Sequence, residues 1–244
     1  MKPRLLSPHA KYTAASPRLV TSSDCHLIVF AKAPVPGKVK TRLVPSLGAL
    51  AAARLYERMV LHSLSTAVNS RVGLVHLWCT PSTEHPFLNR CAKEFQVALH
   101  LQEKGDIGRR MAHAFQETLK VVTFALLLGT DCPSLTQDDL TEAVAALRRG
   151  SNVVFVPTED GGYCLLGLSQ YAPDLFKGIS WGTAFVLEQT RARLRELGWS
   201  WHELTERWDV DRPEDVERLR SEGYLNFNEQ LTNTDKEIGG TLDR

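Results

Sequence analysis

A chain of 244 residues, 43% of them hydrophobic, is long enough to bury one large core, and none of its apolar runs approaches the roughly 20 residues of a membrane span. A formal net charge of +1 gives no overall basic field, which argues against a protein that tracks nucleic acid. Five scattered cysteines without a Cys-x-x-Cys pair indicate reduced thiols and a cytoplasmic location, and argue against a disulfide framework or a zinc site.

The two ends of the chain differ in composition from its middle. Residues 1–24 are basic and rich in Ser and Thr, and predict a mobile leader, with organelle targeting as the less favoured alternative. Residues 224–244 are predicted to be a weakly ordered tail. Between them, residues 25–223 are expected to form a single domain.

Apolar and amphipathic runs alternate along this middle part. In chain order they predict a strand at 26–31, a helix at 47–68, a strand at 72–79, a helix at 82–94, a strand at 95–101, a helix at 107–119, a strand at 124–128, a helix at 140–147, strands at 152–156 and 163–168, a helix at 187–197, a strand at 200–204 and a helix at 213–223. This alternation predicts a three-layer α/β/α fold with a mostly parallel sheet, which binds ligands at the carboxyl ends of its strands.

A basic loop follows the first predicted strand, in a stretch that holds no acidic residue between Asp24 and Glu57. Its cations are Lys32, Lys38, Lys40 and Arg42. Pro34 and Pro36 restrict the backbone and Gly37 permits a tight turn, so the cations are held in place before an anion arrives. The spacing is not that of a Walker loop, because Val39 follows Gly37-Lys38. The loop is therefore predicted to bind phosphate, with a solvated surface loop as the alternative.

Two carboxylates follow later predicted strands. Asp131, in Gly129-Thr-Asp-Cys-Pro133, could hold a divalent ion between phosphate oxygens, or could be a turn or cap residue. Asp160 precedes two glycines that would let the backbone approach a ligand, although Asp-Gly is also a strong hairpin-turn signal. Lys32, Asp131 and Asp160 are therefore expected at one rim of the sheet.

Two further segments are candidates for the same site. Asp209 and Asp211 would share one face of an extended chain, and such a pair favours a metal ligand, although Asp211 could equally cap the helix that begins near Pro213. The segment 105–111 forms a loop running into a helix, a weak signal for contact with an anion or a nucleobase through Gly105, Asp106 and Gly108.

Taken together, residues 32–43, 129–133, 160–167, 181–183 and 209–211 resemble the glycosyltransferase-A-like family of uncharacterised bacterial transferases of the DUF2064 type. That family is related to 2-phospholactate and molybdenum-cofactor guanylyltransferases. The resemblance covers about residues 26–222, and it implies a nucleotide-diphospho-sugar-transferase fold, one nucleotide-binding transferase domain and a Mg²⁺ or Mn²⁺ site. By position, Lys38, Lys40 and Arg42 match the phosphate loop, Asp131 the metal aspartate, and Asp209 or Asp211 the second carboxylate.

Three functions follow from these residues. The favoured one is a nucleotidyltransferase that moves a nucleoside monophosphate from a triphosphate to a small phosphorylated acceptor and releases pyrophosphate, with Lys38, Lys40 and Arg42 on the phosphates. The alternatives are a glycosyltransferase that uses a nucleotide-sugar, with Asp160 as base, and a non-catalytic nucleotide-binding module. The nucleotide is expected to contact Lys32, Pro34, Gly37, Gly105, Asp106, Gly108 and Asp131, and the acceptor Gly161, Gly162, Trp181 and Thr183. No nucleic-acid partner is expected, and the oligomeric state stays open.

Overall fold

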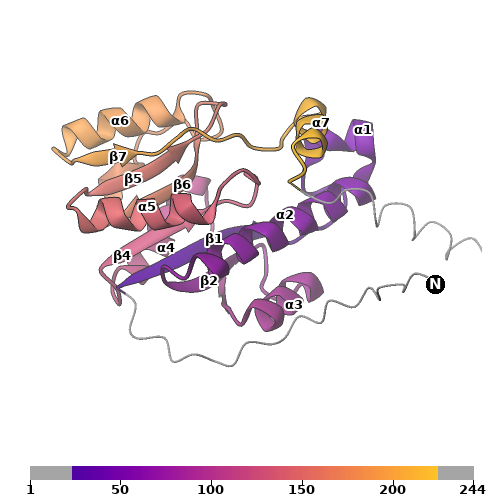
Figure 1. Cartoon of the computed structure of the whole chain (residues 1–244), viewed down its shortest axis with the longest axis horizontal. Coiled ribbons are helices and arrows are strands. Elements are labelled where there is room, and N and C mark those ends of the chain that lie inside the picture. Colours follow the sequence, from indigo (N-terminus) through magenta and orange to yellow (C-terminus); the bar gives the residue numbers. More distant parts are fainter. Residues whose placement is uncertain (1–23, 225–244) are drawn as a thin grey trace, which may run out of the picture.

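A computed structural model describes residues 24–224, so the predicted leader and tail fall outside the described residues. Seven strands form one sheet in the order β3-β2-β1-β4-β6-β5-β7 (Figure 1). The strands are β1 Cys25–Lys32, β2 Leu74–Thr80, β3 Ala98–Leu101, β4 Phe124–Leu128, β5 Val153–Pro157, β6 Tyr163–Leu168 and β7 Trp201–Glu203. Only β6 runs antiparallel to its neighbours, β4 and β5; every other pairing is parallel. The predicted mostly parallel sheet is confirmed.

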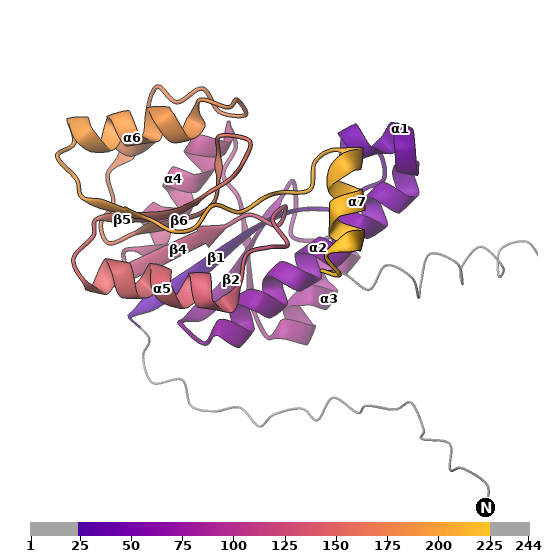
Figure 2. The same ribbon diagram turned by 45° about the horizontal axis from the view of Figure 1, so that its top comes forward.

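Helices cover both faces of the sheet, which confirms the three-layer fold (Figure 2). One face packs against α2 Ala49–Ser70, α3 Pro86–Phe95 and α5 Gln137–Arg148. The other packs against α4 Ile107–Thr118, α6 Val186–Glu196 and the short 3-10 helix η2 Pro173–Phe176. Alternate β1 residues explain this division: Leu27 and Val29 are buried on the first face, Ile28 and Phe30 on the second.

Most predicted boundaries differ from the structure by one to four residues, and two of the differences arise at residues with a positive φ. The helix predicted at 47–68 is interrupted at Gly48, whose φ of 81° separates the short α1 Val44–Leu47 from α2. The strand predicted at 95–101 begins only at Ala98, because α3 continues through Phe95 and ends at Gln96 in a left-handed conformation. Both errors arise at turns in which the backbone conformation of one residue decides the boundary.

A third apolar cluster packs residues 208–219 against helices next to the basic loop. It joins Leu43, in the 3-10 helix η1 Thr41–Leu43, to Met59 of α2, to Trp208 and Val210, and to Leu219 of α7 Pro213–Ser221. Figure 1 shows α7 next to α1, although the two are far apart in sequence. This packing brings Asp209 and Asp211 to the loop at 32–43.

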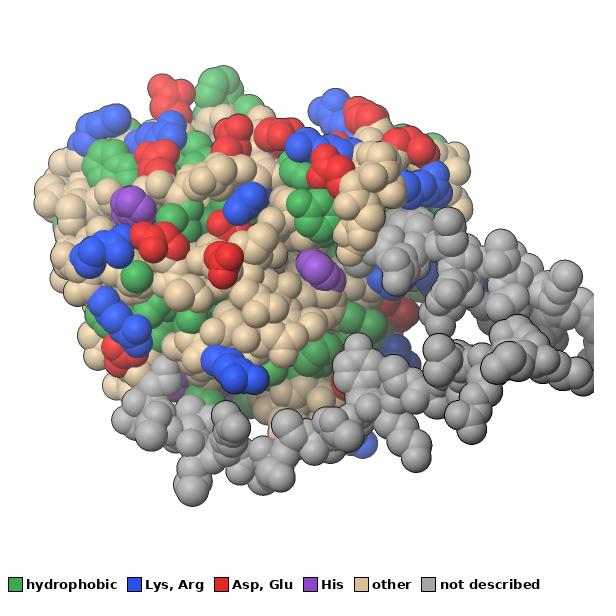
Figure 3. Space-filling view, in the orientation of Figure 1, with side chains coloured by type: hydrophobic (Ala, Val, Ile, Leu, Met, Phe, Trp, Pro, Cys, Tyr) green, Lys and Arg blue, Asp and Glu red, His purple; other side chains and the backbone are tan. Residues whose placement is uncertain are grey.

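The described surface carries both signs of charge. On the face seen in Figure 3, Lys and Arg side chains are interspersed with Asp and Glu. Within residues 24–224, no helix is long and apolar enough to cross a membrane.

Candidate functional site

Three strands place the predicted site residues at one rim of the sheet. Strands β1, β4 and β5 run in the same direction, so Lys32, Asp131 and Asp160 lie at or just beyond the same ends. The segment before α7 reaches this rim as well, because the backbone N–H of Val210 donates to the carbonyl of Asp131 at 2.8 Å. The expectation of a shared rim is confirmed.

Lys40 is the buried cation of this rim. Its side chain is 4% exposed, and its ammonium lies 2.6 Å from Oδ1 of Asp131. The same ammonium donates to the carbonyl of Val210, a residue 170 positions further along the chain. Lys40 adopts a left-handed conformation with φ 45°, which turns the loop so that the side chain points inward. Lys40 therefore ties the basic loop to the metal-candidate aspartate and to the C-terminal segment.

Asp209 shares the electrostatic field of this ion pair. Burial, and next the nearby charges of Asp160 and Asp131, raise the pKa of Asp209 to about 6, while Lys40 opposes the rise. The Asp209 carboxylate thus lies in the field of two other carboxylates and one ammonium. Such a cluster is most stable when a further cation lies among the carboxylates, since each charge otherwise disfavours the next.

Asp211 lies in a different environment from Asp209. Its carboxylate forms an ion pair with Arg42, and its backbone N–H donates to Asp215 at 2.8 Å. Asp211 is therefore held by Arg42, whereas Asp209 lies in the field of Asp131. Helix α7 is capped by Asp215, which accepts from the N–H of Arg212, so Asp211 is not needed as the cap.

The remaining cations of the loop differ in whether their ammonium already has a hydrogen-bond partner. The Lys32 ammonium donates to the carbonyl of Lys38 at 2.7 Å, which closes the loop on itself. Gly37 has a φ of 75°, as the predicted tight turn requires, and Pro34 is buried. Lys38 is exposed and its ammonium has no partner among residues 24–224. Lys38 is thus the cation most available to an incoming phosphate.

Asp160 forms the predicted turn, and its charge also acts on Asp209 in the candidate site. Its Oδ1 accepts from Thr158 Oγ1 at 2.6 Å and from the N–H of Gly162 at 3.0 Å. Gly161 has a φ of 85°, and a methyl group there would lie 2.2 Å from the carbonyl oxygen of Ala184. The need for glycine at 161 is explained by the close approach of the segment 180–185.

The predicted base-reading loop and the predicted acceptor segment meet through one aromatic contact. Asp106 caps α4 by accepting from the N–H of Arg109 at 2.8 Å, after Gly105 with a φ of 120°. A methyl group at Gly108 would lie 2.2 Å from Nε1 of Trp181. Trp181 therefore packs directly on the first turn of α4, whereas Thr183 is exposed and its hydroxyl donates to the carbonyl of Ser180.

Two buried polar residues that the sequence did not single out hold the rim together. The hydroxyl of Tyr56 accepts from the N–H of Lys32 at 2.8 Å and from Thr130 Oγ1 at 3.2 Å, and burial raises its pKa. Gln102, 6% exposed, donates to the carbonyls of Ala31 and Trp78. These contacts join the ends of neighbouring strands. The only sequence signal for them was a polar group within or next to an apolar run.

An ion pair fixes the segment that carries Asp209. Arg207 donates to both carboxylate oxygens of Asp139, at 3.0 and 2.7 Å, and Asp139 is 7% exposed. Asp139 also completes the capping box of α5 with Thr136. The sequence analysis did not identify this pair, because its partners are 68 positions apart.

The donor set fits a hard divalent cation. Asp131 and Asp209 offer carboxylate oxygens, and the Asp131 side chain is 56% exposed, so it can be reached from solvent. Within residues 24–224, no group of three or more His, Cys, Asp or Glu side chains is placed to hold an ion. Mg²⁺ sites that use one or two carboxylates are completed by water and substrate phosphate, so two aspartates are sufficient.

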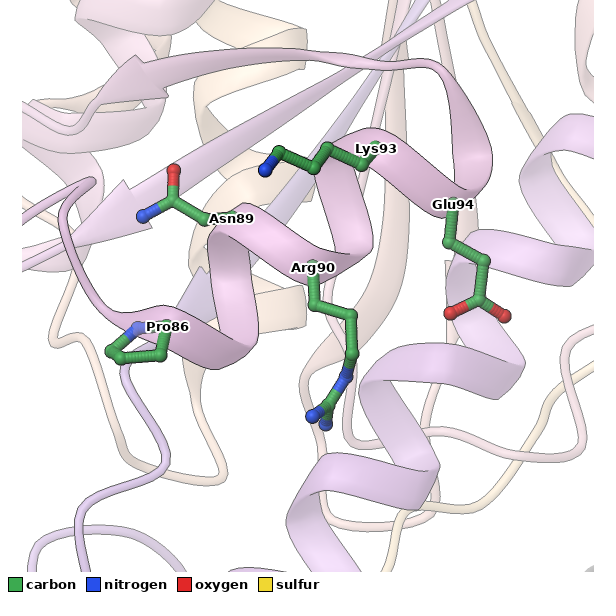
Figure 4. A pocket seen from close by; sticks show the side chains of 5 residues that line it. All are labelled: Pro86, Asn89, Arg90, Lys93 and Glu94. Carbon is green, nitrogen blue, oxygen red and sulfur yellow. The ribbon is translucent and has the colours of Figure 1, made fainter.

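A hollow in the surface lies elsewhere, on α3. It has a volume of about 640 Å³ and is lined only by residues of α3 (Figure 4). Asn89 and Lys93 extend from one side of the helix, and Arg90 and Glu94 from another. None of the predicted site residues lines this hollow.

Comparisons with known proteins agree with this fold. Residues 63–183 match the family DUF2064, described as an uncharacterized protein conserved in bacteria. A structure from Desulfovibrio desulfuricans G20, provisionally named a nucleotide-diphospho-sugar transferase, superposes with a TM-score of 0.75 at 28% identity, over 84% of this chain and 90% of that one. None of the curated proteins matches the chain.

More distant structures share the fold. A cytidylyltransferase from Leptospira borgpetersenii serovar Hardjo-bovis gives a TM-score of 0.55 at 14% identity, over 83% of this chain and 87% of that one. Glucosyl-3-phosphoglycerate synthase from Mycobacterium tuberculosis, bound to Mn²⁺ and uridine diphosphate, gives 0.50 at 12% identity, over 81% and 76%. The fold is that of the nucleotide-diphospho-sugar transferases.

Proposed function

We propose that this chain is a Mg²⁺- or Mn²⁺-dependent nucleotidyltransferase that moves a nucleoside monophosphate from a nucleoside triphosphate to a small phosphorylated acceptor. The observation that carries the proposal is the cluster of Lys40, Asp131 and Asp209 at the carboxyl rim of a mostly parallel sheet. The adjoining loop adds Lys38, an exposed cation with no partner among residues 24–224.

In this reaction an acceptor phosphate oxygen bonds to the α-phosphorus, and the bond from that phosphorus to the β-bridging oxygen breaks, so pyrophosphate leaves. Lys38 and Arg42 would hold the phosphates that depart, and Lys40 would keep Asp131 oriented. Asp131 and Asp209 would hold the metal ion, which when bound supplies charge neutralisation at the phosphate oxygens. Positioning and neutralisation are the main demands of phosphoryl transfer, and this set of cations and carboxylates meets them.

A glycosyltransferase is the second candidate, and two observations favour it. The D. desulfuricans structure carries the provisional name of a nucleotide-diphospho-sugar transferase. In addition, Asp160 lies close enough to Asp209 to affect its pKa, a position from which it could accept a proton from an acceptor hydroxyl.

A panel of nucleoside triphosphates and sugar nucleotides, each with Mg²⁺ and a set of small phosphorylated or hydroxyl acceptors, distinguishes the two reactions. Release of pyrophosphate is expected. Release of a nucleoside diphosphate would support the glycosyltransferase instead. Metal-dependent nucleotide binding with no product over several hours would support a non-catalytic binding module.

Asp131→Asn tests the assignment of the site. The variant should stay folded, with a somewhat lower Tm because the buried Lys40 ammonium loses its ion-pair partner, and it should lose at least about a hundredfold in turnover because the carboxylate that holds the ion is gone. Asp138→Asn, an exposed change a few residues away in the first turn of α5, is the matched control and should keep full activity. Full activity of Asp131→Asn would refute the proposed role.

A further inference from the structure

The two aspartates proposed to hold the metal ion lie on loops, so the sheet itself does not fix the distance between their carboxylates. Asp131 lies in the loop 129–136, between β4 and α5. Asp209 lies in the segment 204–212, between β7 and α7. Because a divalent ion must reach both side chains at once, contacts between these two segments decide whether the site can form.

One buried hydroxyl of the loop 129–136 holds the backbone of the second segment. The hydroxyl of Ser134 donates to the carbonyl of Trp208 at 3.2 Å and accepts from the N–H of the same residue at 3.3 Å. Oγ of Ser134 also lies 3.4 Å from Sγ of Cys132. Since a hydroxyl has a single hydrogen, which here is donated to Trp208, the Cys132 thiol is the donor in this contact. The one donor and two acceptor positions of the hydroxyl are thus all in use, which fixes its orientation.

The residue on the other side of Asp209 is attached to the same loop. The N–H of Val210 donates to the carbonyl of Asp131 at 2.8 Å. Both chain neighbours of Asp209 are therefore hydrogen-bonded to the loop 129–136. The Val210 contact joins two backbone groups and does not depend on any side chain. The Trp208 contact depends entirely on the Ser134 hydroxyl.

Burial makes the Ser134 contact hard to replace. Ser134 is 2% exposed and Trp208 is 5% exposed, so water has little access to either. Among residues 24–224, the backbone N–H and carbonyl of Trp208 have no other hydrogen-bond partner. Buried backbone groups that lose their partner are costly, so the segment would shift to find another one. Such a shift would move Asp209, which is the next residue in the chain.

We propose that Ser134 is a positioning residue of the metal site: its hydroxyl holds Asp209 where that carboxylate and Asp131 can bind one divalent ion together. The proposal rests on the metal-dependent transferase function proposed above and adds a residue that does not itself touch the ion. Mg²⁺ demands oxygen ligands at about 2.0–2.1 Å in nearly regular geometry, so it tolerates little displacement of a carboxylate. Loss of a group that orients the ligands of a metal typically lowers the affinity for that metal by about 10–100-fold.

Titration of Mn²⁺ alone into the full-length Ser134→Ala variant, followed by electron paramagnetic resonance, tests the proposal. Mn²⁺ should bind roughly tenfold more weakly than to the unmodified protein, at the low end of that range because the Val210 contact remains. Binding of tripolyphosphate without metal should be unchanged, because the basic loop keeps Lys38 and its other cations. Alanine is smaller than serine, and circular dichroism checks that the variant is folded.

Ser169→Ala is the matched control. It removes a hydroxyl that donates to the carbonyl of Asn152 at 3.3 Å, just after β6 and away from the site. This variant loses a hydrogen bond of the same kind, so its Tm should also fall, but its Mn²⁺ affinity should equal that of the unmodified protein.

An unchanged Mn²⁺ affinity of Ser134→Ala would overturn the positioning role. An equal loss of tripolyphosphate binding would overturn it too, because that result would indicate a general loosening of the rim. Asp131→Asn separates these results from a failure of the proposed function. If Asp131→Asn binds Mn²⁺ more weakly and Ser134→Ala does not, only the positioning role is refuted. If neither variant weakens Mn²⁺ binding, the proposed metal site is refuted as well.

Discussion

Replacing Lys40 by methionine probes the contact on which the candidate site depends. The change removes the ammonium that lies 2.6 Å from Asp131 and donates to the carbonyl of Val210, and it keeps a long side chain in a place that is 4% exposed. Because methionine fills much of the same volume, packing should change little. The variant therefore isolates the effect of the charge.

The expected loss of stability comes mainly from the Val210 carbonyl. A hydrogen bond from a charged donor contributes about 1.5–3 kcal/mol, and the pair with the half-exposed Asp131 adds at most about 1 kcal/mol. A net loss of about 2 kcal/mol lowers the Tm by about 4–8 °C in a domain of this size. Metal binding should change in the opposite direction, because no ammonium then competes for Asp131. Mn²⁺ should bind about tenfold more tightly without nucleotide, equivalent to about 1.4 kcal/mol.

Thermal unfolding followed by circular dichroism, and Mn²⁺ titration followed by electron paramagnetic resonance, measure the two effects separately. Lys38→Met is the matched control: it removes an exposed cation of the same loop, so Tm and Mn²⁺ affinity should stay unchanged while nucleotide binding weakens. A Lys40→Met variant with unchanged Tm, and with Mn²⁺ affinity no higher than that of the unmodified protein, would refute the reasoning.

Three further predictions concern the surroundings of the site. Gly161→Ala should destabilise the protein by about 2–4 kcal/mol in a urea titration, because the new methyl group would lie 2.2 Å from a carbonyl oxygen and because φ is 85° there. Gly198→Ala is the control: φ is 65° and no atom lies within 4 Å, so the cost should be only about 1 kcal/mol. Arg207→Met leaves the buried Asp139 carboxylate unpaired and should cost about 3–5 kcal/mol by urea titration, and a cost below about 1 kcal/mol would contradict this. The pKa of His76 in the folded protein, about 4, is below its value in the unfolded chain. The stability that depends on neutral His76 is therefore complete above pH 6.5 and is lost as the pH falls from 6.5 to 4. For a partly exposed ring we expect a loss of about 1–2 kcal/mol, and His76→Gln should flatten the pH dependence of the Tm over that range.

Local patterns were sufficient to predict the fold. The strands at 124–128 and 163–168 were predicted with their observed ends, because an apolar run bounded by turn residues signals a buried strand. The rim could be predicted for the same reason, since Lys32, Asp131 and Asp160 follow strands that the alternation with helices makes parallel. The break at Gly48 was missed, because periodicity does not report the conformation of a single residue.

The sequence by itself determined the elements, the layers and the kinds of side chain that reach the rim. Only the tertiary structure decided that Lys40 pairs with Asp131 and that Asp209 lies in the field of this pair. It also decided that Asp211 pairs with Arg42, and that three histidines from three strands hydrogen-bond to one another. The physical reason is the distance along the chain over which each kind of interaction acts. Periodicity and turn chemistry act over a few neighbouring residues, whereas contacts between residues many positions apart depend on the order in which strands pair and on where the helices cover them.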